Sequence, residues 1–210
     1  MTKTDHRDQQ FIAAIGGGPA DDDETFDAAG VLHDRLAAAA ESAGLLDIAY
    51  RTVDSPFGSL LLAATSEGLV RVAFDREGHD TVLGALARTI SPRIMRTPRR
   101  LDAAARELDE YFSGRRRTFE VPVDLRLARG FRRTVLDNLR QIPYGVTRSY
   151  AAVAEAAGHP AAVRAVGSAC SHNPVPVVVP CHRVVRSDGT AGNYLGGPEA
   201  KAALLALEVA

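Results

Sequence analysis

The segment Asn173–Val185 reads NPVPVVVPCHRVV and places a thiol next to an imidazole, at Cys181 and His182, after a β-branched run between prolines. Prolines restrict both their own backbone and that of the preceding residue, so the segment has few accessible conformations. Such a restricted setting for a Cys-His pair indicates chemistry at the sulfur, and we take Cys181 as a candidate nucleophile. The alternative is a buried, inert thiol.

Just before this segment, the sequence predicts two short helices joined by a tight turn. Ser149 is a suitable N-cap for a helix over 150–157, a Gly-His-Pro turn follows at 158–160, and a second helix is expected over 161–171. Alanines on both helices allow close packing, and Arg164 falls in the first turn of the second helix. The pattern is typical of a DNA-binding helix-turn-helix, although an αα-hairpin in a core would look similar.

The rest of the chain predicts two domains and an N-terminal extension. Short strands over 48–53, 60–64 and 69–74 are separated by turn residues and indicate an antiparallel meander, followed by helices over 81–90 and 101–112 and a strand over 119–123. After a boundary near residue 125 we expect a helix over 131–142, a hairpin or wing over 186–192 and a final helix over 199–209. The expected domains are 1–45, 46–125 and 126–210.

Charge is distributed unevenly along the chain. The net charge is −1, but residues 1–48 hold three basic and ten acidic residues, which gives −7 and leaves +6 for residues 49–210. Residues 126–148 alone contain six arginines and one acid. A basic body is compatible with a nucleic-acid partner, and an ordinary solvated surface is the alternative.

The N-terminal extension, 1–45, combines glycines, an acidic run and an alanine-rich stretch. We expect loop or disorder up to about residue 30 and a short docking helix over 31–43; an acidic tail lying over the basic body is the alternative.

Two cysteines, Cys170 and Cys181, do not form a zinc-binding pattern, and a reducing compartment disfavours a disulfide between them. The chain shows neither a secretory signal pattern nor an apolar run long enough to span a bilayer. We therefore expect a cytoplasmic protein with no membrane association, no metal and no cofactor.

Together with Gly192-Asn193-Tyr194 and the glycines at 196 and 197, the Pro-Cys-His-Arg-Val core resembles the O6-alkylguanine-DNA alkyltransferases, also called methylated-DNA–protein-cysteine methyltransferases. The resemblance covers about residues 47–210. It implies an α/β N-terminal domain that is ribonuclease-H-like, with an antiparallel sheet and helices, and a mostly α C-terminal domain that is winged-helix-like. It also implies double-stranded DNA as partner, bound through the minor groove as a monomer.

The resemblance further implies direct, irreversible transfer of an alkyl group from guanine to Cys181. His182 would act through a water as base, Glu208 would orient that imidazole, and Asn173 would tie the recognition helix to the active-site loop. The implied DNA-contacting residues are Tyr150, Arg164, Ala165, Cys170 and Ser187. The implied guanine pocket is formed by the Val184 backbone, Tyr194, Leu195 and Gly196.

Three other readings stay open at this stage: a lesion-binding protein without transfer, a winged-helix regulator in which Cys181 is a core or redox thiol, and a cysteine hydrolase. The last is the weakest, because adjacent Cys and His do not reproduce the spatially assembled dyad of papain-type enzymes. Activity on O4-alkylthymine and cooperative binding on DNA stay open as well.

Overall fold

The structure is a computed structural model that describes residues 22–209, with side chains described from residue 28 onward. Its first half is built on a four-stranded sheet of β1 (Ile48–Val53), β2 (Leu60–Thr65), β3 (Gly68–Phe74) and β4 (Ile94–Arg96), in the order β3-β2-β1-β4. The first three strands form the expected antiparallel meander. The three-residue β4 was not predicted; it pairs parallel to β1, so the sheet is mixed.

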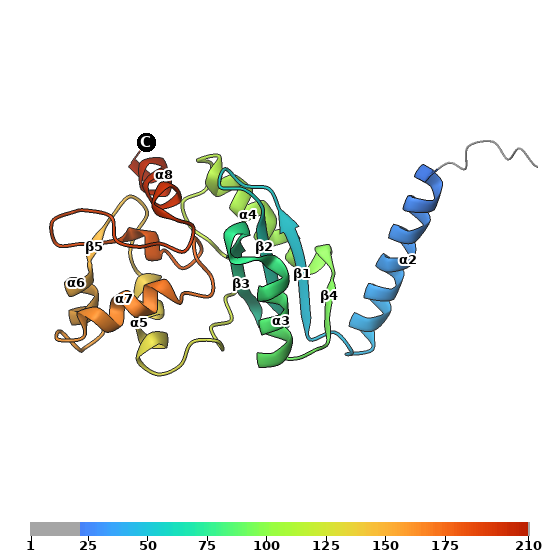
Figure 1. The fold of residues 1–210 in the computed structure, drawn as a ribbon, viewed down its shortest axis with the longest axis horizontal. Helices are drawn as coiled ribbons and strands as arrows, with labels where there is room; N and C mark the ends of the chain where they lie inside the picture. Colours follow the sequence, from blue (N-terminus) through green and yellow to red (C-terminus); the bar gives the residue numbers. More distant parts are fainter. Residues whose placement is uncertain (1–21, 210) are drawn as a thin grey trace, which may run out of the picture.

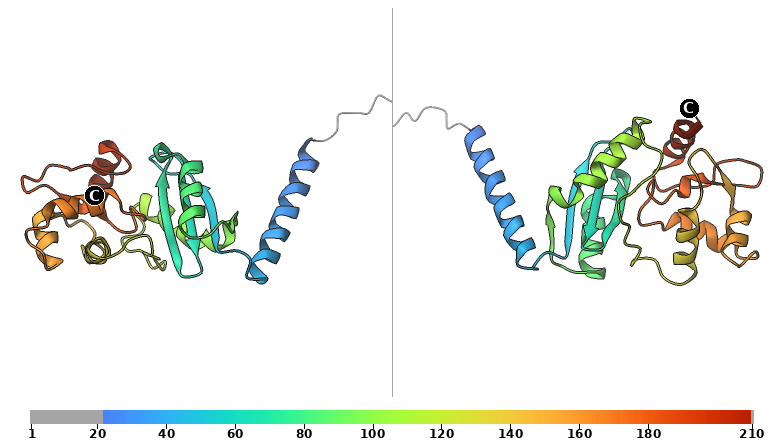
Figure 2. Two further views of the ribbon diagram at one scale, coloured as in Figure 1. Left: turned by 60° about the horizontal axis from the view of Figure 1, so that its bottom comes forward. Right: turned by 180° about the vertical axis from the view of Figure 1, so that it is seen from behind.

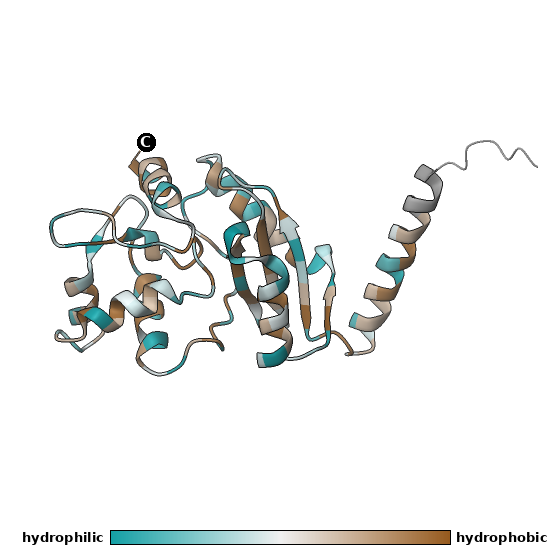
Figure 3. Cartoon of the chain, viewed as in Figure 1, coloured by the Kyte–Doolittle hydropathy of each residue, from teal (hydrophilic) through white to brown (hydrophobic). Residues whose placement is uncertain are grey.

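Helices cover both faces of this sheet (Figure 1), and the alternation of strand residues decides which core each residue joins. On β2, Leu61 and Ala63 pack toward α3 (His79–Thr89) in a small cluster with Val82 and Leu86. Their neighbours on β2 face the other way, into a larger core that includes α4 (Asp102–Phe112). Figure 3 shows the hydrophobic residues concentrated along these strands. The larger core continues into the second half of the chain and includes Cys181.

The strand predicted over 119–123 is not present: the segment forms only a single bridge, between Leu69 and Val123. Pro122 explains this, because it has no N–H to donate to a ladder. The segment is held instead by the Leu69 N–H, which donates to the Pro122 carbonyl at 2.8 Å, and by the buried Glu107 carboxylate, which accepts the N–H groups of Glu120 and Val121.

The second half contains α5 (Phe131–Leu139), α6 (Tyr150–Ala156), α7 (Val163–Ser171) and α8 (Pro198–Val209). The first three pack on one another, and α6 and α7 form the expected helix-turn-helix around Gly158, whose φ is +78°. Ser149 caps α6 as predicted, its hydroxyl accepting the Ala152 N–H at 3.1 Å. α5 ends three residues before the expected Ile142.

Two short strands, β5 (Arg148–Ser149) and β6 (Val184–Val185), join the start of α6 to the segment after Cys181. Beyond β6, the Arg186 N–H donates to Thr190 and Val185 bridges antiparallel to Ala191, which forms the expected hairpin.

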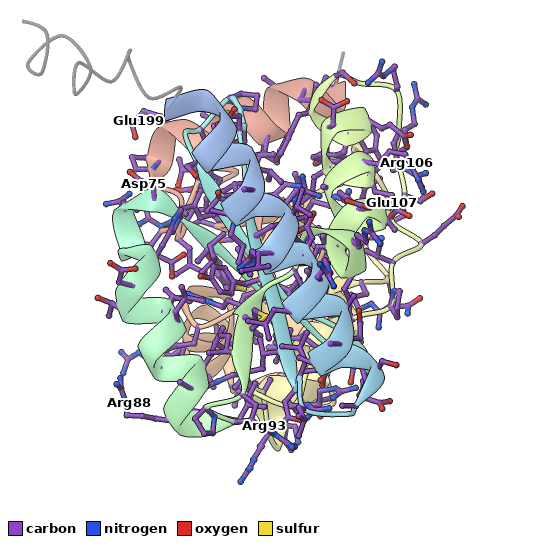
Figure 4. The ribbon with its side chains drawn as sticks, turned by 90° about the vertical axis from the view of Figure 1, so that its right-hand side faces the viewer. Asp75, Arg88, Arg93, Arg106, Glu107 and Glu199 are labelled. Carbon is purple, nitrogen blue, oxygen red and sulfur yellow. The ribbon has the colours of Figure 1, made fainter. Side chains whose placement is uncertain are left out.

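The extension contains α2 (Asp22–Ser42), which is longer than the helix predicted over 31–43 and includes residues expected to be loop. It contacts the sheet half through Ala37, which is buried, through an ion pair between Glu41 and Arg100 at 2.7 Å, and through His33, 2.6 Å from the Arg96 carbonyl oxygen. Figure 2 shows that this helix projects beyond the rest of the chain, and Figure 4 shows it in front of the sheet edge. The remainder of the predicted loop, residues 1–21, lies outside the described residues.

Among residues 22–209, no helix is both long and apolar enough to cross a bilayer.

Candidate active site

Cys181 opens a single turn of 3₁₀-helix, η3 (Cys181–Arg183), and is buried in the core between the two halves. The β-branched run before it is not a strand: the Val179 N–H donates back to the Val175 carbonyl, so the chain turns tightly. Val177 adopts φ +73° at the centre of that turn. A positive φ is strained for a β-branched residue, and the surrounding buried packing is what maintains it. The strained backbone position is therefore located four residues before the thiol.

Asn173 connects the end of α7 to this turn. Its side-chain amide donates to the Val179 carbonyl at 2.8 Å and to the Sγ atom of Cys181 at 3.2 Å, while its side-chain oxygen accepts the Val175 N–H at 3.0 Å. Asn173 is fully buried. One side chain thus fixes the turn and aims a hydrogen-bond donor at the sulfur.

His182 points away from this donor toward the last turn of α8. Its Nε2 atom lies 2.8 Å from Oε1 of Glu208, and both side chains are almost completely buried. Its other nitrogen, Nδ1, is buried and has no hydrogen-bond partner among the described residues.

Glu208 is the centre of a buried charged network rather than a frayed terminal residue. Arg183 donates to both of its carboxylate oxygens through Nε, at 3.0 and 2.9 Å, and to Oε1 through Nη2, at 2.8 Å. The Gly145 N–H and the Tyr111 hydroxyl add donors at 3.1 and 2.5 Å. Burial opposes the charged carboxylate, but the donors from His182, Arg183 and Tyr111 outweigh it and lower the pKa of Glu208 to about 2.

These charges fix the protonation of His182. Burial lowers the pKa of His182 despite the neighbouring carboxylate, so the resting imidazole is neutral. Because ionised Glu208 can only accept, Nε2 carries the proton of the neutral ring and Nδ1 is left with a free lone pair. His182 is therefore arranged as a base at Nδ1.

The thiol itself is neutral at rest. Burial raises the pKa of Cys181 to about 11, although the Asn173 hydrogen bond and the positive charge of Lys201 pull in the other direction. A free thiolate is consequently rare at neutral pH, and deprotonation must accompany the reaction.

Lys201 comes from α8 and is fully buried, with Nζ donating to the Val184 carbonyl at 2.6 Å. Its ammonium lies 6.0 Å from the centre of the Tyr150 ring. Gly192 also packs against Tyr150: a Cβ at position 192 would approach the Tyr150 hydroxyl to 2.3 Å. The Val184 carbonyl, predicted as part of a pocket, is thus engaged by a lysine.

The loop after the hairpin brings Tyr194 next to the site. Its ring lies edge-on to His182 at 6.3 Å and to Phe74 at 5.7 Å, and its hydroxyl is buried with no hydrogen-bond partner among the described residues. Gly196 packs directly on Phe74. Leu195 instead lines a cavity of about 410 Å³ whose lining residues do not include Cys181 or Tyr194.

Comparison with known proteins identifies a family for both halves of the chain. Residues 48–125 match the family model described as "6-O-methylguanine DNA methyltransferase, ribonuclease-like domain", and residues 130–210 match "6-O-methylguanine DNA methyltransferase, DNA binding domain". A methylated-DNA–protein-cysteine methyltransferase from Mycolicibacterium paratuberculosis is 43% identical over 167 residues, which cover 77% of this chain and 92% of that protein. The chain belongs to the methylated-DNA–protein-cysteine methyltransferase family. The constitutive enzyme of Bacillus subtilis is 38% identical, over 76% of this chain and 94% of its own.

Solved structures of the family share the fold. The crystal structure of Mycobacterium tuberculosis OGT in complex with DNA superimposes with a TM-score of 0.66 at 39% identity, over 77% of this chain and 92% of that one. The family therefore accounts for the two-domain fold expected from the sequence, a ribonuclease-like half and a helical DNA-binding half.

The candidate DNA-contacting residues of this family member differ in exposure. Arg164 and Ala165, in the first turn of α7, and Ser187, in the hairpin, are exposed. Tyr150, at the start of α6, is half-buried. Cys170 is only 5% exposed, which leaves it little surface for a contact with DNA.

Sequence reasoning assigned no role to three residues that the fold brings to the site: Tyr111, Arg183 and Lys201. Arg183 was part of the quoted motif, and Lys201 follows the spacing of the buried face of α8, with Leu204 and Glu208. That spacing was a usable signal. Tyr111 gave none, because it sits in the apolar stripe of a helix 71 residues before His182.

Proposed function

We propose that this protein repairs DNA by transferring the alkyl group of O6-alkylguanine directly to the Sγ atom of Cys181. The observation that carries the proposal is the pairing of a neutral buried thiol, which accepts a hydrogen bond from Asn173, with a neighbouring His182 whose Nδ1 is unprotonated. A buried alkyl acceptor next to a base is what a direct displacement requires.

In this reaction the thiol proton passes through a water to Nδ1 of His182. Sulfur then attacks the alkyl carbon, a C–S bond forms, and the C–O6 bond breaks with its electrons going to guanine. The leaving base gains one proton, for which the buried Tyr194 hydroxyl is the donor we assign. Glu208 stabilises the imidazolium that forms, as in other carboxylate–histidine pairs.

DNA supplies the substrate, and the helix-turn-helix is the surface that binds it through the minor groove. An O6-alkyl carbon is inaccessible inside the stack, so the base must be flipped out, which costs a few kcal/mol. Arg164 is exposed at the start of α7 and would fill the gap, with Tyr150 contacting the target phosphate and Ala165 and Ser187 the flanking backbone. The Val184 backbone, Tyr194 and Gly196 form the guanine pocket; Leu195, which lines a separate cavity, is not part of it.

The product is a thioether, which offers water no polarised carbonyl to attack. Cys181 is not regenerated, and one protein repairs one lesion without a cofactor. The domain division at 46–125 and 126–210, action as a monomer and a cytoplasmic location belong to the same proposal; both cysteines are free thiols, as a reducing compartment would leave them.

The test is the intact mass of the protein after incubation with a duplex that contains O6-methylguanine. We expect the gain of one methyl group, mapped by peptide analysis to residue 181 and not to Cys170, and no gain in Cys181→Ala. Tight binding without a mass change would indicate a lesion-binding protein, and equal affinity for modified and unmodified duplexes would indicate a transcriptional regulator. Either outcome would reject the proposal.

A further inference from the structure

Tyr111 comes from α4, in the sheet half of the chain, but its hydroxyl lies inside the network of the other half. The residue is fully buried, and Oη is 2.5 Å from Oε1 of Glu208 and 3.3 Å from Nε2 of His182. The side chain has little freedom, because its ring packs against Phe119 at 5.1 Å and edge-on to Tyr144 at 6.1 Å. The sheet half therefore places one hydroxyl within hydrogen-bonding distance of both the carboxylate and the imidazole.

The hydroxyl of Tyr111 has a single hydrogen, and it donates this hydrogen to Glu208. Burial and the adjacent Glu208 raise the pKa of Tyr111 well above its usual value, so the phenol keeps its proton. Donation to ionised Glu208 leaves only lone pairs of Oη facing Nε2. Both neighbours of Nε2 are then acceptors, which reinforces the proton on Nε2.

The two contacts of Tyr111 have opposite effects on the basicity of His182, and their lengths decide between them. The bond to Glu208 is short, and it draws carboxylate charge away from His182, which makes the imidazolium less favourable. The contact to Nε2 is long and weak, although it would favour the imidazolium. The short bond dominates.

We propose that Tyr111 is a positioning residue that, by donating to Glu208, keeps His182 neutral and protonated on Nε2 until the thiol proton arrives. Besides Tyr111, the groups facing His182 are Glu208 and Lys201 from α8, Arg183 from the same turn, and Tyr194 from the pocket loop. The positive charges of Arg183 and Lys201 act in the same direction as Tyr111. The inference rests on the proposed function only for its effect on the rate of transfer, since the charge state of His182 is a property of the free protein.

The experiment compares Tyr111→Phe with a matched control, Tyr144→Phe. Tyr144 belongs to the same aromatic cluster, but its hydroxyl donates to the Leu207 carbonyl and not to the Glu208 carboxylate. In protein labelled with ¹⁵N-histidine, we expect the neutral wild-type ring to be protonated on Nε2. We expect the titration of His182 to move upward by about half to one pH unit in Tyr111→Phe and to stay in place in Tyr144→Phe.

The methyl-transfer rate should follow the same change. The acid limb of its pH profile should move to higher pH in Tyr111→Phe, so that the rate falls several-fold below neutral pH and approaches wild type at high pH. A purely structural role would lower the rate at every pH without moving the titration. An unchanged or lowered His182 titration, or a wild-type ring protonated on Nδ1, would overturn the inference.

If Tyr111→Phe does not fold, a fluorotyrosine at position 111 provides the second variant. Its more acidic phenol donates more strongly to Glu208, so the His182 titration should move downward, opposite to the phenylalanine variant; no shift would overturn the inference. Because these titrations need no DNA, a protein that fails to transfer methyl groups but shows both shifts would refute the proposed function and leave this inference standing.

Discussion

The side-chain amide of Asn173 points its hydrogen at the Sγ atom of Cys181 over 3.2 Å, from the end of the helix that is expected to read DNA. Together with the positive charge of Lys201, this hydrogen bond opposes the effect of burial on the pKa of the thiol. Asn173→Asp keeps the oxygen that accepts the Val175 N–H but removes the donor and adds negative charge.

We expect this change to raise the pKa of Cys181 above its present value of about 11, because a thiolate then loses its donor and gains a repelling neighbour. Methyl transfer should slow by about tenfold or more. The thiolate absorbance in a pH titration and single-turnover rates provide the measurements. Ser171→Ala, which removes an exposed hydroxyl bonded to the Ser168 carbonyl, is the control and should change neither. A thiol that titrates as in wild type would contradict the assignment.

Glu208→Gln should destabilise the fold as well as stop transfer. The neutral amide leaves the Arg183 guanidinium as a buried charge without a counterion, and breaking a buried ion pair in this way costs about 3–5 kcal/mol. Denaturant unfolding at neutral pH measures the loss. Glu199→Gln, exposed at the other end of α8 (Figure 4), should stay within about 0.5 kcal/mol of wild type.

The stability contributed by Glu208 depends on pH in a defined direction. Its pKa is lowered from 4.5 to about 2 in the folded protein, so its contribution is fully present above pH 4.5 and is lost as the pH falls toward 2. The difference in unfolding free energy between wild type and Glu208→Gln should therefore narrow across this window. A difference that stays constant would show that Glu208 does not carry the charge we assign to it.

The sequence predicts local features well and long-range contacts poorly. The meander and the helix-turn-helix with its Ser149 cap follow from turn residues and spacing close together in the chain. Strand β4 could not be predicted, because three residues carry no periodicity and its pairing depends on the distant β1. The prediction of a strand over 119–123 was wrong, because Pro122 has no N–H to donate to a neighbouring strand.

The same distinction applies to the site. Cys181, His182 and Asn173 are within nine residues of one another, so a single short motif identifies all three as candidate site residues. Glu208 required the family resemblance, since its partner Arg183 is 25 residues away. Tyr111 is 97 residues from Glu208. Its position in the apolar stripe of a helix predicts a buried ring, but it does not predict that the hydroxyl donates to a buried carboxylate.

Arg164→Ala should separate base flipping from chemistry. Because Arg164 is exposed in the first turn of α7, its loss should slow transfer from duplex DNA while leaving transfer from a free O6-alkylguanine base unchanged. If the guanidinium contacts a phosphate, the plot of the logarithm of the DNA-binding constant against the logarithm of salt concentration should become less steep, by about one unit of slope. Arg88→Ala, an exposed arginine on α3 (Figure 4), is the charge-matched control and should behave as wild type. If Arg164→Ala slowed transfer from duplex DNA and from the free base by the same factor, Arg164 would have no specific role in base flipping.

Gly196→Ala tests the contact between the sheet half and the pocket loop. A Cβ at this position would lie 2.7 Å from two ring atoms of Phe74 and 3.0 Å from the Cβ of Ala200, closer than packed atoms tolerate. Neither neighbour can yield easily, because Phe74 is buried in β3 and Ala200 belongs to α8. We expect a loss of about 1–3 kcal/mol in unfolding free energy and slower transfer, since the loop that carries Tyr194 is displaced.

Phe74→Leu supplies the second arm of this test, because it removes the ring that the new methyl group would strike. If the clash with the ring causes the loss of stability, Gly196→Ala should lower the unfolding free energy less in the Phe74→Leu background than in wild type. The coupling energy between the two substitutions should be about 0.5–3 kcal/mol. Gly30→Ala is the control, as a Cβ there meets no atom within 4 Å. Strictly additive effects of the two substitutions would mean that Gly196 is required for another reason, such as close approach of the flipped base, and transfer rates on lesions of increasing alkyl size would then distinguish that case.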